Sequence, residues 1–354
     1  MERTRFALVG CGKIANKHAQ VIHDYLDNVE IAAFCDIVPE NARRFGEKYG
    51  APSFSSIRQM MEAMEHEIDV VSVLTPSGLH AENVLELVQY GKPLVVEKPL
   101  ALRLEDADRI LEACDIYGVR IFVVHQNRYN VPIIKAREAL EQGRFGKLVL
   151  GTIRLRWRRD QSYYDSAPWR GTWAYDGGVF MNQASHHIDM LAWFMGGVDT
   201  VKAMAAKRLA DIECEDTGIA MIRFHDGALG LLEATTATRP KDLEGSISVL
   251  GEKGSVVIGG FYMNELTSWQ FEDHQPIDDV IFEKYGSNPD VFGYNLGEYL
   301  KGVLVSIKSK KAALVDGLEG RKSLELITAI YESIETGHDI ALRFRPQECK
   351  LGIV

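Results

Sequence analysis

The first third of the chain alternates short apolar runs with stretches of helical periodicity. The periodic stretches are residues 39–49, 56–64, 80–90 and 104–117, and the apolar runs between them are residues 68–74, 94–96 and 121–124. These runs are rich in Val and Ile and continuously apolar, which is typical of parallel strands covered by helices on both faces. The pattern therefore predicts a doubly wound parallel sheet of the α/β class, whose ligands bind beyond the carboxyl ends of the strands.

A different pattern begins in the second half of the chain. Residues 149–159 alternate in polarity, so that one face holds Ile153, Leu155 and Trp157 and the other holds Arg154, Arg156 and Arg158. This alternation is typical of a half-exposed strand in an open antiparallel sheet. The arginine row has two interpretations: a solvated face paired with local carboxylates, or a grip for an anionic substrate.

Turn signals follow in series after this strand. Asp226-Gly227 joins apolar stretches at residues 217–224 and 228–236, and a second turn at 251–254 lies between two further strand patterns. Hairpins after a half built of crossovers predict a second domain of α+β type with a large, open, mostly antiparallel sheet. We expect the first domain to span residues 1–125 and the second, for substrate binding and oligomerisation, residues 126–354.

A glycine turn connects the first predicted strand to the first helix. Gly10 suits the sharp turn, Gly12 lets a pyrophosphate approach the backbone amides, and Ala15 lets the helix pack closely on the strand. The next strand ends at Asp36, where a carboxylate can bind the adenine ribose hydroxyls and repel a 2′-phosphate. The sequence therefore predicts a Rossmann dinucleotide site that favours NAD over NADP.

Composition excludes several classes of protein. A chain of 354 residues exceeds one ordinary core, and 46% apolar with 25% charged residues is a globular composition. The net charge of −10 argues against nucleic acid or an anionic membrane as partner. No apolar run approaches the ~18 residues of a membrane span, and the five cysteines are scattered without a C-x-x-C pair. We expect a cytoplasmic protein with reduced thiols.

Polar residues follow three of the predicted parallel strands. Thr75-Pro76 with His80 follows one run, Glu97-Lys98-Pro99 the next, and a polar stretch beginning at His125 the last. Strand ends of a parallel sheet share an edge, so these groups predict a ligand crevice beside the glycine turn. For Lys98 alone, a solvated surface charge is the alternative.

A second polar constellation follows Gly177-Gly178. If residues 179–194 form a helix, Asn182, His186 and Asp189 share one face. The neighbouring His186 and His187 would point about 100° apart, so we predict no metal site. A neutral imidazole can instead accept a hydroxyl proton near pH 7.

Three of these motifs give the chain a family resemblance over nearly its full length. Gly10-x-Gly12-x-x-Ala15, Thr75-Pro76 with His80, and Glu97-Lys98-Pro99 resemble the Gfo/Idh/MocA oxidoreductases. The resemblance implies an NAD-dependent sugar dehydrogenase in which Lys98 and His186 are catalytic and move the hydroxyl proton. Asn182 replaces the Asp of that family, and an amide can only orient substrate. The implied cofactor-binding residues are Gly10, Gly12, Lys13, Ile14, Asp36, Thr75, Pro76, His80, Glu97, Lys98, Gln126, Trp169 and Arg170.

The likeness extends to one branch of the family. Residues 182–189, with 126–130 and Tyr163-Tyr164, are similar to the branch that oxidises C3 of UDP-N-acetylglucosaminuronic acid during diamino sugar acid and polysaccharide biosynthesis. This implies a homotetramer and a set of substrate-binding residues: Lys98, Arg128, Tyr129, Arg156, Arg158, Tyr163, Tyr164, Asn182 and His186.

Three other functions stay open at this point. The chain could oxidise a free sugar or inositol, reduce a keto-sugar, or act as a regulator that senses NAD or sugar without turnover. The catalytic interpretation requires Lys98 and His186 to approach the same sugar hydroxyl.

Overall fold

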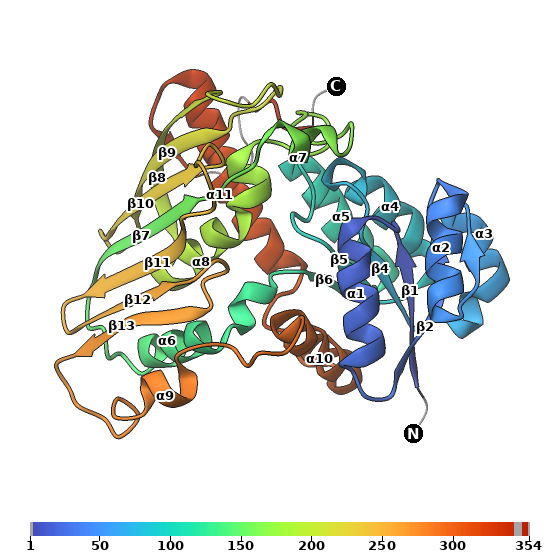
Figure 1. Cartoon of the computed structure of the whole chain (residues 1–354), viewed down its shortest axis with the longest axis horizontal. Helices are drawn as coiled ribbons and strands as arrows, with labels where there is room; N and C mark the ends of the chain where they lie inside the picture. Colours follow the sequence, from blue (N-terminus) through green and yellow to red (C-terminus); the bar gives the residue numbers. More distant parts are fainter. Residues whose placement is uncertain (1–2, 343–348, 353–354) are drawn as a thin grey trace. The chain divides into compact units, whose positions relative to one another are not determined.

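The computed structural model of the protein describes residues 3–342 and 349–352. The chain divides into two compact units (Figure 1). The first comprises Met1–His125 and Phe292–Arg321, and the second comprises Gln126–Val291 and Lys322–Val354.

The first unit contains a six-stranded, all-parallel sheet in the order β3-β2-β1-β4-β5-β6. Its strands are β1 (Thr4–Val9), β2 (Val29–Cys35), β3 (Ser53–Phe54), β4 (Val70–Val73), β5 (Leu94–Val96) and β6 (Ile121–Val123). The predicted doubly wound sheet is confirmed. The strand order reverses between β1 and β4, which is the switch point where such sheets bind ligands.

Helices of the first unit follow the predicted apolar periodicity. They are α1 (Lys13–Asp24), α2 (Pro39–Tyr49), α3 (Ile57–Met64), α4 (His80–Leu87), α5 (Leu104–Tyr117) and α10 (Tyr294–Ser309), with 3-10 turns at Glu65–Glu67, Ser77–Leu79 and Val88–Tyr90. On α1 the buried stripe is Ala15, His18, Ala19 and Ile22, which recur at helical spacing. One position of this stripe is therefore a histidine.

Helix α10 packs with the first unit, which differs from the predicted division of the chain at residues 292–321. The Tyr25 hydroxyl on the chain after α1 donates to Glu298 at 2.7 Å. Gly297 lies so close to the Tyr25 ring that a Cβ there would meet it at 2.1 Å. The apolar face of α10 was visible in the sequence, but its partner was not.

The second unit contains an eight-stranded sheet in the order β13-β12-β11-β7-β10-β9-β8-β14. Its strands are β7 (Leu148–Arg156), β8 (Val198–Ala206), β9 (Thr217–Phe224), β10 (Leu229–Thr235), β11 (Glu244–Gly251), β12 (Gly254–Gly259), β13 (Glu265–Phe271) and β14 (Ile340–Ala341). The β7–β10 pair is parallel and the other pairs are antiparallel. The predicted mostly antiparallel sheet is confirmed.

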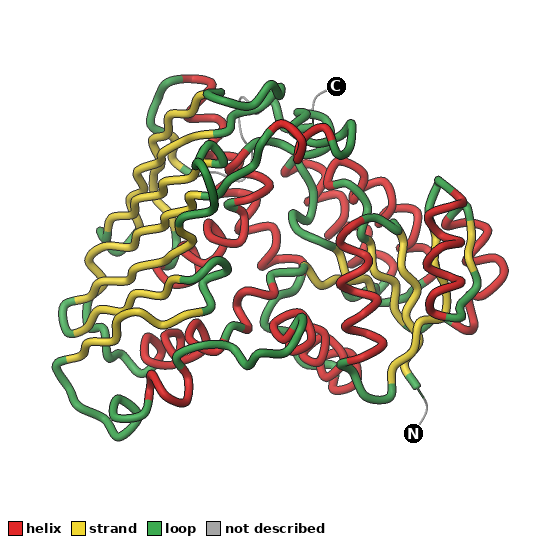
Figure 2. Tube along the Cα trace, viewed as in Figure 1, coloured by secondary structure: helices red, strands yellow, loops and turns green. Residues whose placement is uncertain are grey.

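Helices cover one side of this sheet. The unit contains α6 (Val131–Glu141), α7 (Gln161–Asp165), α8 (Ser185–Met195), α9 (Ile281–Tyr285), a π-helical turn at Val179–Gln183 and a 3-10 turn at Gln126–Tyr129, and α11 (Gly317–Thr336) continues into it. Figure 2 shows the helices in red beside the yellow strands, and Figure 1 labels α6 and α8 on the same side. The opposite face of β9 exposes Ile219 and Met221.

Candidate functional site

The glycine turn between β1 and α1 has the geometry of a phosphate cradle. Gly10 has φ +92°, and a Cβ there would lie 2.8 Å from the backbone of Leu74 and Thr75, so only glycine fits. Gly12 caps α1 without a side-chain hydrogen bond, and a Cβ there would meet nothing within 4 Å. An anion can therefore approach the first amides of α1. Of the other residues predicted here, Lys13 is exposed and Ile14 is half-buried.

Asp36 fixes the end of β2 against this turn. Its Oδ2 accepts the Cys11 N–H at 2.7 Å, and its Oδ1 accepts the Val38 N–H at 2.8 Å. Burial, together with the nearby Asp36 charge, raises the pKa of the Cys11 thiol to about 12, so the thiol stays protonated. The carboxylate stands beside the turn, as a ribose contact requires, and these residues fit a bound NAD.

His80 ties two strand ends together. Its Nδ1 lies 2.7 Å from the Pro99 carbonyl oxygen, and its Nε2 lies 2.9 Å from the Thr75 carbonyl oxygen. The ring is 1% exposed, and burial lowers its pKa. Thr75 also donates its hydroxyl to Asn83 at 2.8 Å. These contacts support a positioning role for His80, and its predicted contact with the cofactor stays a prediction.

Glu97 is a buried carboxylate beside Lys98. Its Oε1 lies 2.8 Å from His18 Nε2, and its Oε2 accepts the Lys98 backbone N–H at 3.1 Å. The Lys98-Pro99 peptide bond is cis. The Lys98 side chain is half-buried, while Glu97 and His18 are buried. The glutamate of the Glu-Lys-Pro motif thus anchors the lysine that follows it to helix α1.

The segment after Gly177-Gly178 departs from the predicted single helix. Residues Val179–Gln183 form a π-helical turn, and the α-helix α8 begins only at Ser185. The Ala184 N–H donates to the Val179 carbonyl at 2.8 Å, which closes the wider turn. Asn182 and His186 are half-buried, but Asp189 is 1% exposed.

Asp189, which the sequence groups with Asn182 and His186, is paired in the interior of the second unit. Asp189 accepts hydrogen bonds from Arg128 Nε at 2.9 Å and Nη2 at 2.7 Å. Arg128 is itself 2% exposed. This bidentate pair is buried inside the second unit. A contact of Arg128 with the substrate stays a prediction.

Two buried carboxyl groups flank the π-helical turn. Asp176 accepts hydrogen bonds from the Asn182 side-chain amide and, at 2.8 Å, from the Gly171 N–H. Glu215 accepts from the Phe180 N–H at 3.1 Å and from the Tyr331 hydroxyl at 2.7 Å. Burial raises the pKa of Glu215 to about 7.

Glu215 also explains one of the two glycines. A Cβ at Gly178 would lie 2.1 Å from the Glu215 carboxyl group, so a side chain cannot be placed there. The Gly178 N–H donates to Tyr331 at 3.1 Å. The Glu215–Tyr331 pair thus determines the path of the chain into the segment that contains Asn182 and His186.

Tyr163 and Arg170 form a polar cluster next to this segment. The Tyr163 hydroxyl accepts hydrogen bonds from Arg170 Nη1 at 2.6 Å and from Gln183 Nε2 at 3.4 Å. The Arg170 guanidinium also lies over the rings of Tyr163 and Trp169, at 4.4 and 4.5 Å from their centroids. Both predicted residues are therefore near Asn182 in the same unit.

The remaining predicted ligand contacts include Tyr164, which packs edge-on against Tyr163 with 5.1 Å between the ring centroids, and residues of the turn after β6. Tyr164 is 5% exposed and its hydroxyl contacts Thr236 at 3.0 Å, inside a small core with Ala210 and Ile212. The predicted contact of Tyr164 with the substrate stays a prediction. Gln126 and Tyr129, in the 3-10 turn after β6, are half-buried.

Helix α8 packs on the face of β7 opposite the arginine row. On that face the ring of His187, a residue of α8, contacts the ring of Trp157. Arg156 contacts Glu233 at 2.6 Å and Glu244 at 3.2 Å, and Arg158 contacts Asp160 at 2.5 Å. The geometry favours the interpretation of a solvated row paired with carboxylates. A role of Arg156 and Arg158 in substrate binding stays a prediction.

His187, in the first turn of α8, is a packing residue. It is 0% exposed, its ring lies edge-on to Trp157, and burial lowers its pKa to about 3. Within residues 3–342 and 349–352, no group of three or more His, Cys, Asp or Glu side chains is placed to hold a metal ion.

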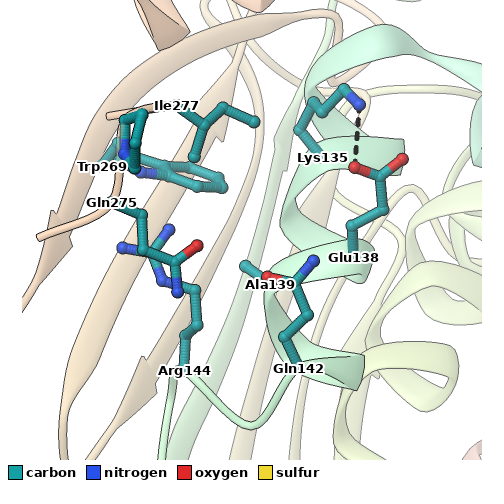
Figure 3. Close-up of a pocket in the computed structure, with 9 residues that line it drawn as sticks. Lys135, Glu138, Ala139, Gln142, Arg144, Trp269, Gln275 and Ile277 are labelled. Atoms are coloured by element: carbon teal, nitrogen blue, oxygen red, sulfur yellow. Dashed lines mark hydrogen bonds and ion pairs between the residues drawn. The ribbon is translucent and has the colours of Figure 1, made fainter. Parts of the chain in front are cut away.

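A pocket of about 240 Å³ lies elsewhere in the second unit (Figure 3). Its charged groups are paired within the protein: Lys135 with Glu138 at 2.8 Å, and Arg144 with Asp278 at 2.7 Å. The lining residues are Lys135, Glu138, Ala139, Gln142, Arg144, Trp269, Gln275, Pro276 and Ile277. They include none of the predicted site residues.

Sequence reasoning missed His18, Asp176 and Glu215. His18 had a usable signal, because a histidine in the apolar stripe of α1 must find a polar partner in the interior. Asp176 directly precedes the two glycines, but its contact with Asn182 depends on the π-helical turn. Glu215 gave no local signal.

Comparison with known proteins covers both units. Residues 4–125 match the family described as "Oxidoreductase family, NAD-binding Rossmann fold", and residues 137–342 match "Oxidoreductase family, C-terminal alpha/beta domain" of the same Gfo/Idh/MocA group. No helix within the described ranges is long and apolar enough to cross a membrane.

Solved structures and a characterised relative resemble the whole chain. The WlbA dehydrogenase from Bordetella pertussis, in complex with NADH and UDP-GlcNAcA, is 42% identical, with coverage of 97% of this chain and 98% of that chain and a TM-score of 0.93. The Chromobacterium violaceum WlbA complex is 40% identical, with coverage of 97% of each chain and a TM-score of 0.90. Myo-inositol 2-dehydrogenase of Thermotoga maritima is 26% identical, with coverage of 96% of this chain and 98% of the relative.

Proposed function

Because the chain belongs to the Gfo/Idh/MocA oxidoreductase family and is an NAD-dependent dehydrogenase, we propose that it oxidises C3 of UDP-N-acetyl-D-glucosaminuronic acid to the 3-keto sugar. The observation that supports this substrate most strongly is the 42% identity, across 97% of the chain, to a dehydrogenase crystallised with NADH and UDP-GlcNAcA. The product would feed diamino sugar acid and polysaccharide biosynthesis.

Two side chains are proposed to move the hydroxyl proton. Lys98 follows the buried Glu97, which fixes the backbone from which the lysine side chain extends. His186 lies in the first turn of α8, directly after the π-helical turn. Bound NAD would accept the hydride from the ring carbon, while Lys98 and His186 remove the proton from its hydroxyl.

Substrate contacts are proposed on the π-helical turn and its neighbours. Asn182 presents an amide beside His186, and Tyr163 and Arg170 form the adjoining polar cluster. The guanidinium of Arg170 has the charge to receive an anionic group of the cofactor or the uronate. Tyr129 and Gln126 are proposed as further ligand contacts on the turn after β6.

A second candidate substrate class is a free polyol. The similarity to myo-inositol 2-dehydrogenase extends over 347 residues, at 26% identity. Oxidation of an inositol or a free sugar, or reduction of a keto-sugar, would use the same lysine and histidine. The two classes differ in whether the substrate must have a nucleoside diphosphate.

The substrate assay is spectrophotometric. Purified protein with NAD is titrated with UDP-GlcNAcA, UDP-GlcNAc, free N-acetylglucosamine and myo-inositol, and the formation of NADH is followed by absorbance. We expect turnover with UDP-GlcNAcA alone or by far the fastest with it. Turnover of a free hexose or inositol, without turnover of the nucleotide sugar, would refute the proposed substrate.

We also propose a homo-oligomer, a tetramer as in the resembled branch, in the cytoplasm. The supporting feature is an apolar patch on the face of the second sheet opposite α8. The patch comprises Met204, Ile219, Met221, Leu229 and Leu231, each between 41% and 68% exposed. Patches of this kind on a soluble domain mark interaction surfaces.

A further inference from the structure

Asp176 is a buried carboxylate to which neither the sequence analysis nor the proposed mechanism gives a role. It is 1% exposed and lies in the loop before Gly177-Gly178. Its Oδ2 accepts the Gly171 N–H at 2.8 Å, and its Oδ1 accepts a hydrogen bond from Asn182 Nδ2. Its own N–H donates to the Thr172 carbonyl at 3.2 Å, so the loop is closed on itself.

This contact determines which end of the Asn182 amide faces the loop. A carboxylate offers only acceptors, so the side chain that faces Asp176 must present its NH₂ group. The amide is planar, and its carbonyl oxygen therefore points away from Asp176. The backbone at this position is also fixed, because the Asn182 N–H donates to the Gly178 carbonyl at 3.0 Å.

The orientation matters because an asparagine cannot accept a proton. In the resembled family an aspartate stands at this position, and Asn182 can reproduce only its hydrogen-bond acceptor. It does so only when the carbonyl oxygen, rather than the NH₂ group, faces the ligand. A reversed amide would present a donor where the sugar hydroxyl needs an acceptor.

We propose that Asp176 is a positioning residue for the dehydrogenation: it holds the Asn182 amide so that its carbonyl oxygen accepts a hydrogen bond from a sugar hydroxyl next to the one that is oxidised, whose own proton is left to Lys98 and His186. This inference rests on the proposed function, because it requires a sugar alcohol as substrate. In this role Asp176 acts through its hydrogen bond with Asn182.

The variant Asp176→Asn tests the orientation directly. The new amide at position 176 must keep an oxygen toward the Gly171 N–H, so it turns its NH₂ group toward Asn182. Two facing NH₂ groups are unfavourable, and the Asn182 amide is expected to reverse. We expect kcat to fall by about 10- to 100-fold, the effect of leaving one hydroxyl of the bound sugar without its hydrogen-bond acceptor. The Kd for NADH should stay unchanged.

A second variant distinguishes orientation from general damage. In Asp176→Asn combined with Asn182→Asp, the amide at 176 donates to a carboxylate at 182, which again presents an acceptor. We expect kcat to recover at least about tenfold over Asp176→Asn. The pH profile should also change, with activity falling as the new carboxylate is protonated. A structural role would not change the pH profile, and Asn182→Asp alone should lose activity because two carboxylates then meet.

Glu213→Gln is the matched control. Glu213 accepts the Trp173 N–H of the same loop at 2.9 Å but is exposed. This variant should retain the wild-type kcat. Wild-type kcat in a folded Asp176→Asn protein, or no recovery in the folded double variant, would overturn the proposal.

The assays use whichever sugar alcohol the wild-type protein oxidises, so a wrong choice of sugar refutes the proposed substrate and leaves the Asp176 test intact. Neutron diffraction from a deuterated crystal provides a readout without substrate. We expect deuterons on the amide atom of Asn182 that faces Asp176. Deuterons on the other amide atom would overturn the inference even if no substrate were found.

Discussion

His18 Nε2 lies 2.8 Å from Glu97 Oε1, and both side chains are buried in the first unit. Burial by itself would raise the pKa of Glu97. The hydrogen bond from His18 and the charges of His18, Lys98 and His80 together outweigh burial, so the pKa of Glu97 lies below its ordinary value of 4.5. The carboxylate beside the predicted catalytic lysine is therefore ionised in the folded protein.

Glu97→Gln should destabilise the protein at neutral pH. The change removes the charge from two buried hydrogen bonds, and we expect the free energy of unfolding to fall by about 1.5–3 kcal/mol. Because the folded pKa is depressed, the stabilisation by Glu97 is present above pH 4.5 and is lost as the pH falls through the folded pKa. Urea denaturation at pH 7 and at pH 4 should therefore show a smaller pH effect in the variant.

Glu30→Gln serves as the comparison for this prediction. Glu30 pairs with Arg3 at 3.1 Å, but the two side chains are 42% and 66% exposed. Its loss should cost at most about 1 kcal/mol. Equal losses of unfolding free energy at the two positions would show that the buried pair with His18 stabilises the protein no more than an exposed ion pair does.

Asp36→Asn should weaken the preference for NAD over NADP. The amide removes the charge that repels a 2′-phosphate, yet it can still accept the Cys11 N–H that Asp36 accepts at 2.7 Å. Like-charge contacts cost several kcal/mol, so the ratio of the two dissociation constants should change by about tenfold or more. Calorimetric titration with both cofactors measures it.

Asp36→Ala separates the two roles of this carboxylate. Alanine removes the acceptor for Cys11 as well as the charge, so the affinity for NAD itself should also fall. An unchanged NAD to NADP ratio in Asp36→Asn would exclude Asp36 as the discriminating group.

The parts of the fold that the sequence predicted are those governed by local pattern. Helices α2 and α5 and strand β5 begin and end where periodicity placed them. Their patterns are clear because the two helices pack an apolar stripe on the sheet and β5 is buried within it. The glycine turn was also predictable, because Gly10 and Gly12 lie between a strand pattern and a helix pattern, where a phosphate-binding turn requires glycine.

The parts of the fold that the sequence did not predict depend on contacts between residues that are far apart in the chain. The π-helical turn before α8 depends on Glu215 and Tyr331, which lie far along the chain from Gly178. Arg128 and Asp189 looked like polar site residues because a sequence does not reveal that the two side chains form a buried ion pair. Helix periodicity places residues on a face, but it does not identify what that face contacts.

The change in stability between pH 4.5 and 7 should report the buried carboxyl group of Glu215 beside Gly178. Burial raises the folded pKa of Glu215 from 4.5 to about 7. Because the folded pKa is raised, the contribution to stability is complete below pH 4.5 and is lost as the pH rises through 7. Relative to Glu215→Gln, the wild-type free energy of unfolding should fall by up to about 1.4 kcal/mol per pH unit between pH 4.5 and 7 and should level off above pH 7.

Denaturant unfolding of both proteins between pH 5 and 9 measures this difference. Glu213→Gln removes a charge from the adjacent surface position without altering the buried carboxyl. Parallel pH profiles of wild-type protein and Glu215→Gln would show that Glu215 is ionised throughout.

Met221→Lys should disrupt the proposed oligomer. Met221 is 61% exposed and pairs across the sheet with Leu231, in the centre of the apolar patch. A lysine there would place a charge in a buried interface, so association should weaken by at least about tenfold. Sedimentation velocity measures the shift to smaller species. Ile116→Lys, at a 73% exposed residue of α5, should leave the oligomer unchanged, and the same result for Met221→Lys would exclude this face.

Lys98→Met should abolish hydride transfer while NAD binding persists. Methionine keeps most of the length of the side chain but cannot hold or move a proton, and general acid–base catalysis typically contributes about 10²–10⁴ in rate. Stopped-flow NADH absorbance measures the loss, and fluorescence titration measures NADH binding. Lys48→Met, at an exposed residue of α2, should behave as wild type.

The partnership of Lys98 with His186 is tested by combining Lys98→Met with His186→Asn. If both side chains serve the same proton, the second substitution should add little to the first, because residues that act as a unit are strongly non-additive. If the two losses multiply instead, the side chains assist separate steps. A His186→Asn protein with full activity would remove the imidazole from the reaction and leave Lys98 as its only base.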